Sequence, residues 1–449
     1  MADVDLDIEA LSPAGDGLGV DGGRTWLVPF TIPGERVRVR PAPHGRTARL
    51  LAVLRPSPHR VTPKCRHFGP AAVPGVGPCG GCAWQHIAYA EQLRLKTGIV
   101  DRLVREAVRG APAARPTLPA TPIDDPWGYR QKVHFVFGTG GDGALVMGHY
   151  VRGSRRIVPV DECPVHDERG NALAFQLQAA LERRRVAAAD NRRGGTLRAV
   201  AVRVALRSDE MLATIVAAHT GDARLRAATR ATMADRQDVA FHLNVQPTAS
   251  PYIFGRDTRR LQGTERLREA IDGTSFLIAP TAFFQTNVAA AERLVALVLE
   301  SIPRGARVLD LYAGAGLFAL PLARQGCTVT AVEENRDAVA AGIAAARLNG
   351  IDAQACRFVA RRAEDAIATG TVADAVVLDP PRDGCTTTVI DAVFGGLRPR
   401  VAAYVSCNPE ALATDLARIV ARGYRIRSLQ PVDMFPHTAH IETVAVVSR

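Results

Sequence analysis

Cys407 is the residue of this sequence best placed to act as a nucleophile. It lies in a Ser-Cys-Asn-Pro turn at 406–409, after an apolar run over 401–405 that predicts a strand and before a stretch from Glu410 that predicts a helix. A cysteine at such a turn lies beside a helix N-terminus, whose partial positive charge favours the thiolate. Most buried cysteines are inert packing, so the position of Cys407, more than its type, indicates chemistry.

Two carboxylates follow or begin strands of the same region. Asp379 ends the apolar run 375–378 and is followed by two prolines and an arginine, which stiffen the turn. This places the Asp379 carboxylate beside the reactive end of a bound cofactor. Glu442 is the second residue of the last predicted strand, 441–447, and is able to act as a general base if it lies within hydrogen-bond reach of the reacting atom. The alternatives are a rigid surface turn for Asp379 and an exposed acid for Glu442.

A glycine-containing loop predicts a nucleotide-type cofactor site. The predicted strand 307–311 ends at Tyr312, and Gly314 and Gly316 then let the backbone approach a ligand. Glu333 closes the next strand, where it is placed to accept ribose hydroxyl protons. Because Gly314, Gly316 and Ala319 also satisfy a loosened dinucleotide fingerprint, the loop by itself leaves the cofactor open.

The elements that must position these residues have α/β character. From residue 307 onward, short apolar runs rich in β-branched residues alternate with helical stretches, which predicts a doubly wound parallel sheet of the Rossmann-like type. Ligands bind such sheets at the carboxyl ends of the strands. We therefore expect the glycine loop, Asp379 and Cys407 to meet at one edge.

The rest of the chain predicts two further domains. Apolar and charged residues alternate over 4–10 and 36–40, which favours an OB-like β-barrel over 1–56, bounded by the Pro-Ser-Pro break at 56–58. Helical spacing over 87–109 predicts an amphipathic helix, and strand patterns return from 127 to about 275. The predicted domains are the barrel (1–56), a central β-rich α+β domain (57–86 and 120–275) and the catalytic domain (87–119 and 276–449).

Four cysteines outside the catalytic domain have the spacing of a metal site. Cys79 and Cys82 form a C-x-x-C pair, with Cys65 upstream and Cys163 downstream as third and fourth ligands. The spacing is compatible with zinc and with an iron-sulfur cluster.

The sequence shows no signal peptide and no long apolar span, and its 449 residues carry a net charge of +11. We therefore expect a cytoplasmic protein without membrane attachment. In that compartment we expect the cysteines to be free of disulfides.

A polyanionic partner fits this charge. The surplus of basic residues, 56 against 45 acidic ones, is spread along the chain and suits nucleic acid, although composition alone does not distinguish this from coding bias. Arg130, Lys132 and His134 share one face of a predicted strand that is expected either to touch RNA or to be a solvated face.

Five motifs resemble those of the RNA uracil-C5 methyltransferase family along nearly the whole chain. In chain order they are Phe283-Phe284-Gln285-Thr286-Asn287, Asp310-Leu311-Tyr312, Asp379-Pro380-Pro381-Arg382, Ser406-Cys407-Asn408-Pro409, and Phe435-Pro436-His437-Thr438 with His440-Ile441-Glu442. The resemblance implies S-adenosylmethionine as methyl donor and RNA as substrate. It also implies cofactor contacts by Gln285, Tyr312, Glu333 and Asp379.

The resemblance implies Cys407 as nucleophile and Glu442 as base, and the chemistry requires such a pair. C5 of uracil is too weak a nucleophile to take a methyl group unaided, whereas a thiolate that adds at C6 creates an enolate whose C5 is able to attack. The C5 proton must then leave before the thiol is eliminated, which requires a base. The chain departs from the family at Ala313 and Ala411, where Cys and Thr are usual.

The resemblance further implies that the N-terminal barrel is a TRAM domain and that Cys65, Cys79, Cys82 and Cys163 hold a [4Fe-4S] cluster, with zinc as the alternative. An insertion between Arg66 and Pro78 separates Cys65 from Cys79 more widely than is usual in the family. By analogy, the four cysteines favour ribosomal RNA over tRNA as substrate.

Two other functions remain open from the sequence. An RNA cytosine-C5 methyltransferase uses two cysteines near the ends of neighbouring strands, which Cys385 and Cys407 loosely match, but Arg382 stands where that family has cysteine. A non-enzymatic RNA-binding scaffold would explain the barrel and the charge but not an intact Cys407 and Glu442. We expect a monomer.

Overall fold

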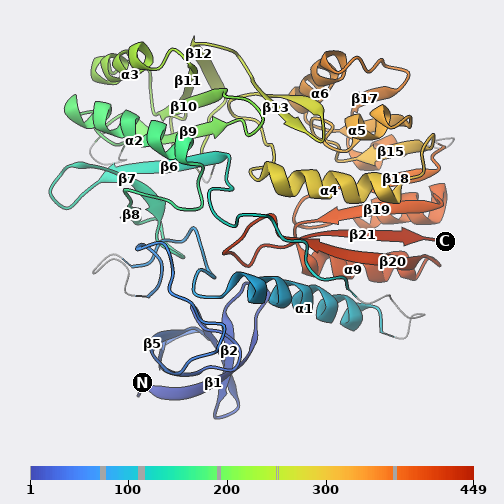
Figure 1. Cartoon of the computed structure of the whole chain (residues 1–449), viewed down its shortest axis with the longest axis horizontal. Helices are drawn as coiled ribbons and strands as arrows, with labels where there is room; N and C mark the ends of the chain where they lie inside the picture. The colour runs from blue at the N-terminus through green and yellow to red at the C-terminus, as the bar shows by residue number, and fades with distance from the viewer. Residues whose placement is uncertain are drawn as a thin grey trace.

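The computed structural model describes residues 2–70, 77–109, 117–189, 194–248, 250, 252–367 and 372–449. In the part of the chain that the structure describes, four sheets follow one another, and the N-terminal sheet lies at one end of the molecule (Figure 1). Part of the expected insertion between Arg66 and Pro78, and part of the predicted segment 87–119, lie outside the described residues.

The N-terminal sheet has five antiparallel strands in the order β3-β2-β1-β4-β5. They are β1 (Val4–Leu11), β2 (Gly17–Asp21), β3 (Arg24–Val28), β4 (Arg36–Pro41) and β5 (Ala48–Arg55). The alternating pattern is confirmed, because every second residue of β4 is buried. A bridge between Leu27 and Thr47 brings the two edges of the sheet near each other. On the outer face Arg38 and Arg40 pair with Asp5 and Asp3.

The central sheet has seven strands in the order β12-β11-β10-β9-β6-β7-β8. They are β6 (Lys132–Thr139), β7 (Leu145–Tyr150), β8 (Ile157–Pro159), β9 (Leu197–Val204), β10 (Met211–Ala217), β11 (Val239–Val245) and β12 (Asp257–Gln262). Helix α2 (Glu168–Arg183) packs on β6 and β9, and α3 (Ala223–Asp235) packs beside α2. A hairpin of β13 (Leu267–Ile271) and β14 (Thr274–Ile278) then leads to α4 (Val288–Ser301).

The predicted basic face of β6 is not an open surface. Lys132 and His134 are half-buried, and burial lowers the pKa of Lys132 to about 7 and that of His134 to about 3. His134 and Arg130 line the cavity that contains the four cysteines. A fully solvated strand face is therefore excluded at these positions, while contact with RNA stays a prediction.

The C-terminal sheet carries the predicted doubly wound pattern, in the order β17-β16-β15-β18-β19-β21-β20. Its strands are β15 (Arg307–Leu311), β16 (Thr328–Glu333), β17 (Cys356–Ala360), β18 (Ala375–Leu378), β19 (Val401–Ser406), β20 (Arg425–Val432) and β21 (Glu442–Ser448). The first five are parallel, whereas β21 runs antiparallel between β19 and β20. The sheet is thus mixed, and the predicted doubly wound α/β class is confirmed for its five parallel strands.

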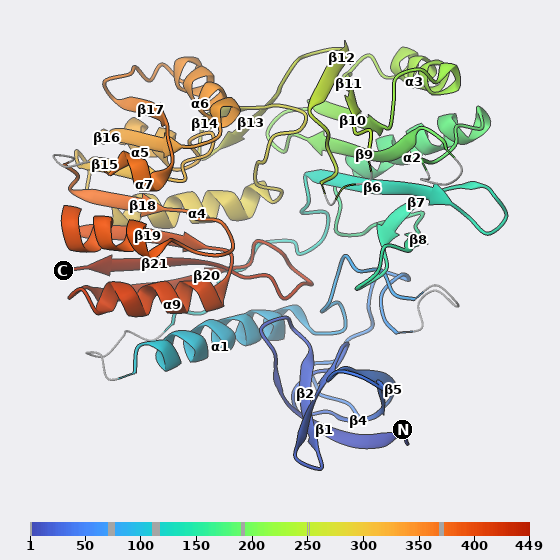
Figure 2. The ribbon, with the colours of Figure 1, turned by 180° about the vertical axis from the view of Figure 1, so that it is seen from behind.

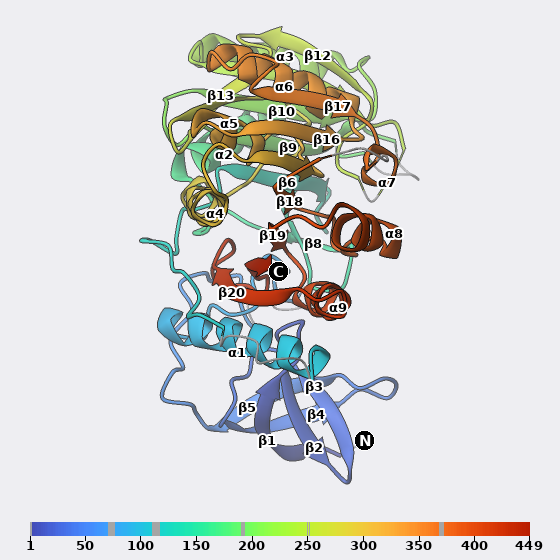
Figure 3. The same cartoon turned by 90° about the vertical axis from the view of Figure 1, so that its right-hand side faces the viewer.

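Helices cover both faces of this sheet (Figures 2 and 3). Those within the C-terminal region are α5 (Ala319–Arg324), α6 (Arg336–Leu348), α7 (Ala363–Ala366), α8 (Thr387–Ile390), the π-helix η1 (Asp391–Leu397) and α9 (Pro409–Val420). Helix α1 (Tyr89–Ala107), far earlier in the sequence, packs on α9 and β20. Among the described residues, no helix is long and apolar enough to cross a membrane.

Candidate active site

The carboxyl ends of three parallel strands bring the predicted catalytic segments together. In the register of the sheet, Leu311 of β15 is opposite Leu378 of β18, which is in turn opposite Tyr404 of β19. Asp379 continues this contact, because its backbone N–H donates to the Leu311 carbonyl at 3.3 Å. The loops that begin at Tyr312, Asp379 and Cys407 therefore start from adjacent positions at one edge of the sheet.

The glycine loop is held by the neighbouring strand. The backbone N–H of Gly314 donates to Oε2 of Glu333 at 3.0 Å, and that of Ala313 donates to the Val332 carbonyl. A β-carbon at Gly316 would lie 2.7 Å from Cζ of Phe358, whereas one at Gly314 would meet nothing within 4 Å. Packing therefore requires glycine at 316, while the space over Gly314 is open.

Buried acidic groups lie beneath this loop. Asp310 is 0% exposed, and neither of its carboxylate oxygens has a hydrogen-bond partner among the described residues. Burial raises its pKa well above the usual range, with a further contribution from Asp379. Burial also raises the pKa of Asp379 to about 7. Such poorly compensated acids favour a ligand that carries positive charge.

Cys407 and Glu442 lie near each other at the ends of two antiparallel strands. Ser406, the last residue of β19, is opposite Thr443 of β21, and Cys407 and Glu442 are the residues next to this pair. Burial and Asp379 raise the pKa of Glu442 to about 8, while Arg382 opposes the shift. The thiol and the predicted base thus belong to one electrostatically coupled group.

The strand-to-helix turn at Cys407 is confirmed, and the surroundings of its thiol oppose the effect of the helix N-terminus. The Asn408 side chain caps α9 by accepting from the Glu410 N–H at 3.0 Å. Burial, and then Glu442, nevertheless raise the pKa of Cys407 to about 11, against the opposing charge of Arg382. Burial and a neighbouring acid thus oppose the thiolate, which the helix N-terminus is predicted to favour.

Cys385 lies apart from this thiol, in a buried network. It is 4% exposed, and its N–H donates to Oδ2 of Asp415 at 2.8 Å. The Tyr404 hydroxyl donates to the same oxygen at 2.6 Å. Asp415 therefore joins the loop that follows Asp379 to the strand that leads to Cys407. The sequence analysis missed Asp415, although a carboxylate on the buried face of an amphipathic helix is a recognisable signal.

Gln285 lies on the loop that joins β14 to α4. This loop is anchored on both sides, since the Thr286 carbonyl accepts from the Gln131 N–H at 2.7 Å and the Asn287 side chain donates to the Met434 carbonyl at 2.9 Å. Gln285 itself is half-buried, and no hydrogen bond among the described residues joins it to the 312–316 loop. Its cofactor contact stays a prediction.

Helix α1 holds the segment that precedes Glu442. The helix was predicted from the sequence, but these contacts were not. Nζ of Lys96 lies 2.6 Å from Oδ1 of Asp433, and both side chains are 0% exposed. The Gln92 side chain accepts from the His437 N–H at 2.8 Å. His437 has a φ of +63°, a strained conformation for a non-glycine residue, and these contacts stabilise it.

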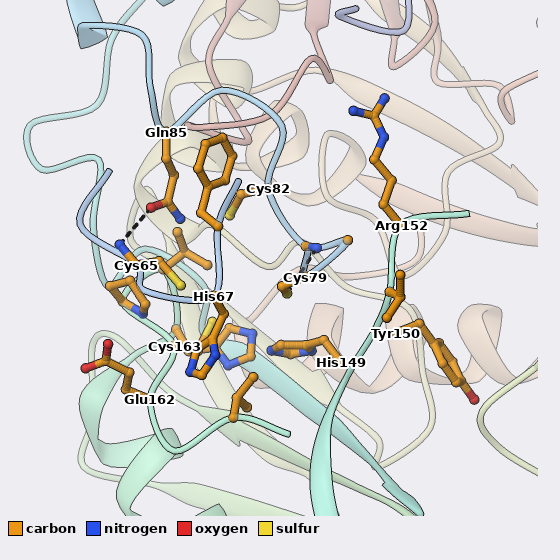
Figure 4. A pocket seen from close by; sticks show the side chains of 18 of the residues that line it. Cys65, His67, Cys79, Cys82, Gln85, His149, Tyr150, Arg152, Glu162 and Cys163 are labelled. Carbon is orange, nitrogen blue, oxygen red and sulfur yellow. Dashed lines mark hydrogen bonds between the residues drawn. The ribbon is translucent and has the colours of Figure 1, made fainter. Parts of the chain in front are cut away.

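All four predicted metal-binding cysteines line one cavity of about 410 Å³ (Figure 4). Burial raises the pKa of Cys65 to about 11 and that of Cys82 to about 12, and it also raises the pKa values of Cys79 and Cys163. The cavity also contains histidines that the sequence analysis missed, among them His149 and His166. The C-x-x-H spacing of 163–166 was the available signal.

Residues 128–449 match the family model described as tRNA (Uracil-5-)-methyltransferase. An RNA methyltransferase of uncharacterised specificity from Thermosynechococcus vestitus is 37% identical, with 100% of this chain and 98% of the relative covered. A 23S rRNA (uracil(747)-C(5))-methyltransferase from Pyrococcus abyssi is 34% identical, with 97% of each covered.

Among solved structures, the chain is similar to a Pyrococcus abyssi tRNA (uracil-54, C5)-methyltransferase in complex with S-adenosyl-L-homocysteine. The TM-score is 0.77 at 26% identity, with 99% of this chain and 100% of the other covered.

Proposed function

The chain belongs to the tRNA (uracil-5-)-methyltransferase family and is an S-adenosylmethionine-dependent RNA uracil-C5 methyltransferase, and from this premise we propose that it methylates a uridine of 23S rRNA through a covalent adduct with Cys407. The observation that supports the mechanism is the proximity of Cys407, directly after β19, to Glu442, the first residue of the paired strand β21, which raises the pKa of the thiol. A nucleophile and a base on adjacent strands fit addition at C6 followed by proton removal at C5.

The residues at the strand ends fit the cofactor. S-adenosylmethionine supplies an electrophilic methyl group on a positively charged sulfur. The open space over Gly314 and the buried acids Asp310 and Asp379 suit a ligand with that charge. Gln285, Tyr312, Gly316 and Glu333 complete the proposed cofactor-binding set.

In the proposed reaction the Cys407 thiolate adds to C6 of uracil, and the C5–C6 π electrons move toward O4 to give an enolate. C5 then attacks the methyl carbon, and the methyl–sulfur bond breaks with its electrons on sulfur. Glu442 removes the C5 proton, the C6–S bond breaks, the C5–C6 double bond re-forms and Cys407 is free again. The raised pKa of Glu442, about 8, suits a base that works near neutral pH.

Arg382 is the charge that assists both groups. It lowers the pKa of Cys407 and of Glu442 against the effect of burial, and its carbonyl accepts from the Asn408 side chain at 2.9 Å. The loop after Asp379 and the turn at Cys407 are thereby connected. We propose that Arg382 stabilises the thiolate during adduct formation.

We propose a [4Fe-4S] cluster on Cys65, Cys79, Cys82 and Cys163 that has a structural role. Zinc bound at about 2.3 Å by several thiolates holds their sulfurs about 3.8 Å apart. Among the described residues, no three of these cysteines have sulfurs that all lie within 4.8 Å of one another. That spacing favours a polynuclear cluster over one zinc ion. Purified protein without iron and without broad visible absorbance would contradict the proposal.

We propose ribosomal RNA as the substrate and the N-terminal sheet as a TRAM-type, OB-like RNA-binding domain. A 23S rRNA methyltransferase is among the relatives that are more than 30% identical to this chain. The net charge of +11 also supports binding to a polyanion. The central and catalytic domains, in the predicted bounds, would complete the RNA surface of a cytoplasmic monomer. A tRNA substrate is the alternative, which the similar solved structure favours.

The test is methyl transfer to defined RNAs. Wild-type protein, Cys407→Ala and Cys385→Ala are incubated with methyl-labelled cofactor and with 23S rRNA or tRNA transcripts. We expect label in uracil of 23S rRNA, loss of labelling in Cys407→Ala and retention in Cys385→Ala. Label in cytosine, or equal labelling by Cys407→Ala, would overturn the mechanism, while label in tRNA alone would overturn the target.

A further inference from the structure

The cysteine cavity contains a second set of metal-ligating side chains. Among the described residues, His149, Cys163 and His166 form the set whose donor atoms all lie within 4.8 Å of one another. Cys163 and His166 come from a single turn, closed by a 3.1 Å hydrogen bond from the His166 N–H to the Cys163 carbonyl. His149 comes from β7, and Figure 4 shows its ring directed into the cavity toward Cys163.

The two imidazoles have ligand atoms that the protein leaves unsatisfied. Nε2 of His149 and Nδ1 of His166 are buried, and neither has a hydrogen-bond partner among the described residues. His166 is only 2% exposed. A buried polar atom without a partner costs free energy that a bound ion would recover.

The rings are also held in place by packing. Phe135 contacts both of them, with centroid distances of 4.9 Å to His149 and 5.1 Å to His166. Such support restricts the rotation of the imidazoles and lowers the entropic cost of binding an ion.

We propose that His149, Cys163 and His166 bind one divalent transition-metal ion of zinc type, in a ligand set that shares Cys163 with the four-cysteine set. Tetrahedral zinc with one sulfur and two nitrogen ligands holds these atoms roughly 3.3 to 3.6 Å apart, so the observed spacing closes with small side-chain rotations. The ion takes the place of the Cys163 thiol proton, which is released to solvent. The fourth position faces the cavity and is filled by water.

The two occupants exclude each other because both require Cys163. The site therefore binds zinc when the cluster is absent, and zinc blocks the assembly of the cluster. Among the histidines that line the cavity, His134 and His67 lie outside the set of three. They are matched controls of the same residue type in the same cavity.

The test is a titration of the metal-free full chain with Co²⁺, a spectroscopic substitute for zinc. We expect one bound ion with visible tetrahedral bands and a charge-transfer band from a single thiolate. His149→Gln should weaken binding by more than about 100-fold, the upper limit for losing a group that merely supports a ligand. His134→Gln should bind as wild type does.

A triple variant Cys65→Ser, Cys79→Ser, Cys82→Ser identifies the ligand set. We expect it to bind Co²⁺ with unchanged affinity and the same spectrum. Loss of binding in this variant together with normal binding by His149→Gln would overturn the proposal. Iron-sulfur reconstitution, measured separately, should be unaffected in His149→Gln. Neither measurement uses RNA or methyl donor, so failure here leaves the methyl-transfer proposal untouched.

Discussion

The buried ion pair between Lys96 and Asp433 gives the sharpest prediction on how the active-site segment is held. Lys96 Nζ lies 2.6 Å from Asp433 Oδ1 and 3.1 Å from the Phe435 carbonyl. Both charged side chains are 0% exposed, and burial lowers the pKa of Lys96 in spite of the carboxylate. Replacing Lys96 by Met leaves a buried carboxylate without a counter-charge.

The expected cost follows from this burial. Removing one partner of a fully buried pair destabilises a protein by about 3–5 kcal/mol, whereas removing both charges is far less costly. Lys96→Met and Asp433→Asn should therefore each lower the free energy of unfolding by about 3–5 kcal/mol, and the double variant by less than their sum. The control is Arg105→Met on the same helix, whose pair with Asp101 is exposed and worth at most about 1 kcal/mol.

Urea unfolding followed by circular dichroism measures these differences, and methyl transfer under native conditions is measured in parallel. We expect Lys96→Met to lose activity as well as stability, since Asp433 anchors the segment that leads to Glu442. A cost below about 1 kcal/mol for Lys96→Met, or additive costs in the double variant, would refute the reasoning.

Three further predictions concern the site itself. Because the pKa of Glu442 is raised to about 8, its carboxyl is protonated at low pH and gains base activity as it ionises. Release of tritium from C5 of uracil should therefore rise about tenfold per pH unit below pH 8, and a flat profile between pH 6 and 8 would contradict this. Asp379→Asn should reduce by about tenfold the preference for S-adenosylmethionine over S-adenosylhomocysteine, whose sulfur carries no charge, as measured by calorimetry. An unchanged ratio of the two dissociation constants would exclude a contact between Asp379 and the sulfonium charge. Asp415→Ala leaves the Cys385 N–H and the Tyr404 hydroxyl without their acceptor, so it should cost about 1–3 kcal/mol in denaturant unfolding, and a neutral substitution would show that water replaces the carboxylate.

The parts of the fold that the sequence predicted well are those set by local periodicity. Helix α1, expected over 87–109, spans Tyr89–Ala107, and the strand expected over 401–405 is β19, Val401–Ser406. The meeting of Asp379 and Cys407 at one sheet edge followed from a general rule for α/β sheets. Each of these inferences needed only neighbouring residues and a known architecture.

The parts that were missed depend on contacts between distant residues. Lys96 lies on the apolar face of α1, three residues before Ile99 and four before Val100, but only the packing of α1 on the C-terminal segment brings it to Asp433. The raised pKa of Cys407 has the same origin, because its burial and the proximity of Glu442 arise from tertiary structure. His149 was likewise unremarkable until β7 placed it beside Cys163.

The most direct test of the central claim is the capture of the covalent intermediate. We incubate Glu442→Gln with S-adenosylmethionine and the uracil-containing substrate RNA. The protein should become covalently linked to RNA through C6 of the uracil, and this adduct should survive denaturing electrophoresis because it cannot lose its C5 proton. After nuclease digestion, mass spectrometry should locate the methylated nucleotide on Cys407, and Glu442→Gln combined with Cys407→Ser should show no adduct. An adduct on Cys385 or any other residue, or an undiminished adduct in the double variant, would contradict the assignment of Cys407 as the nucleophile.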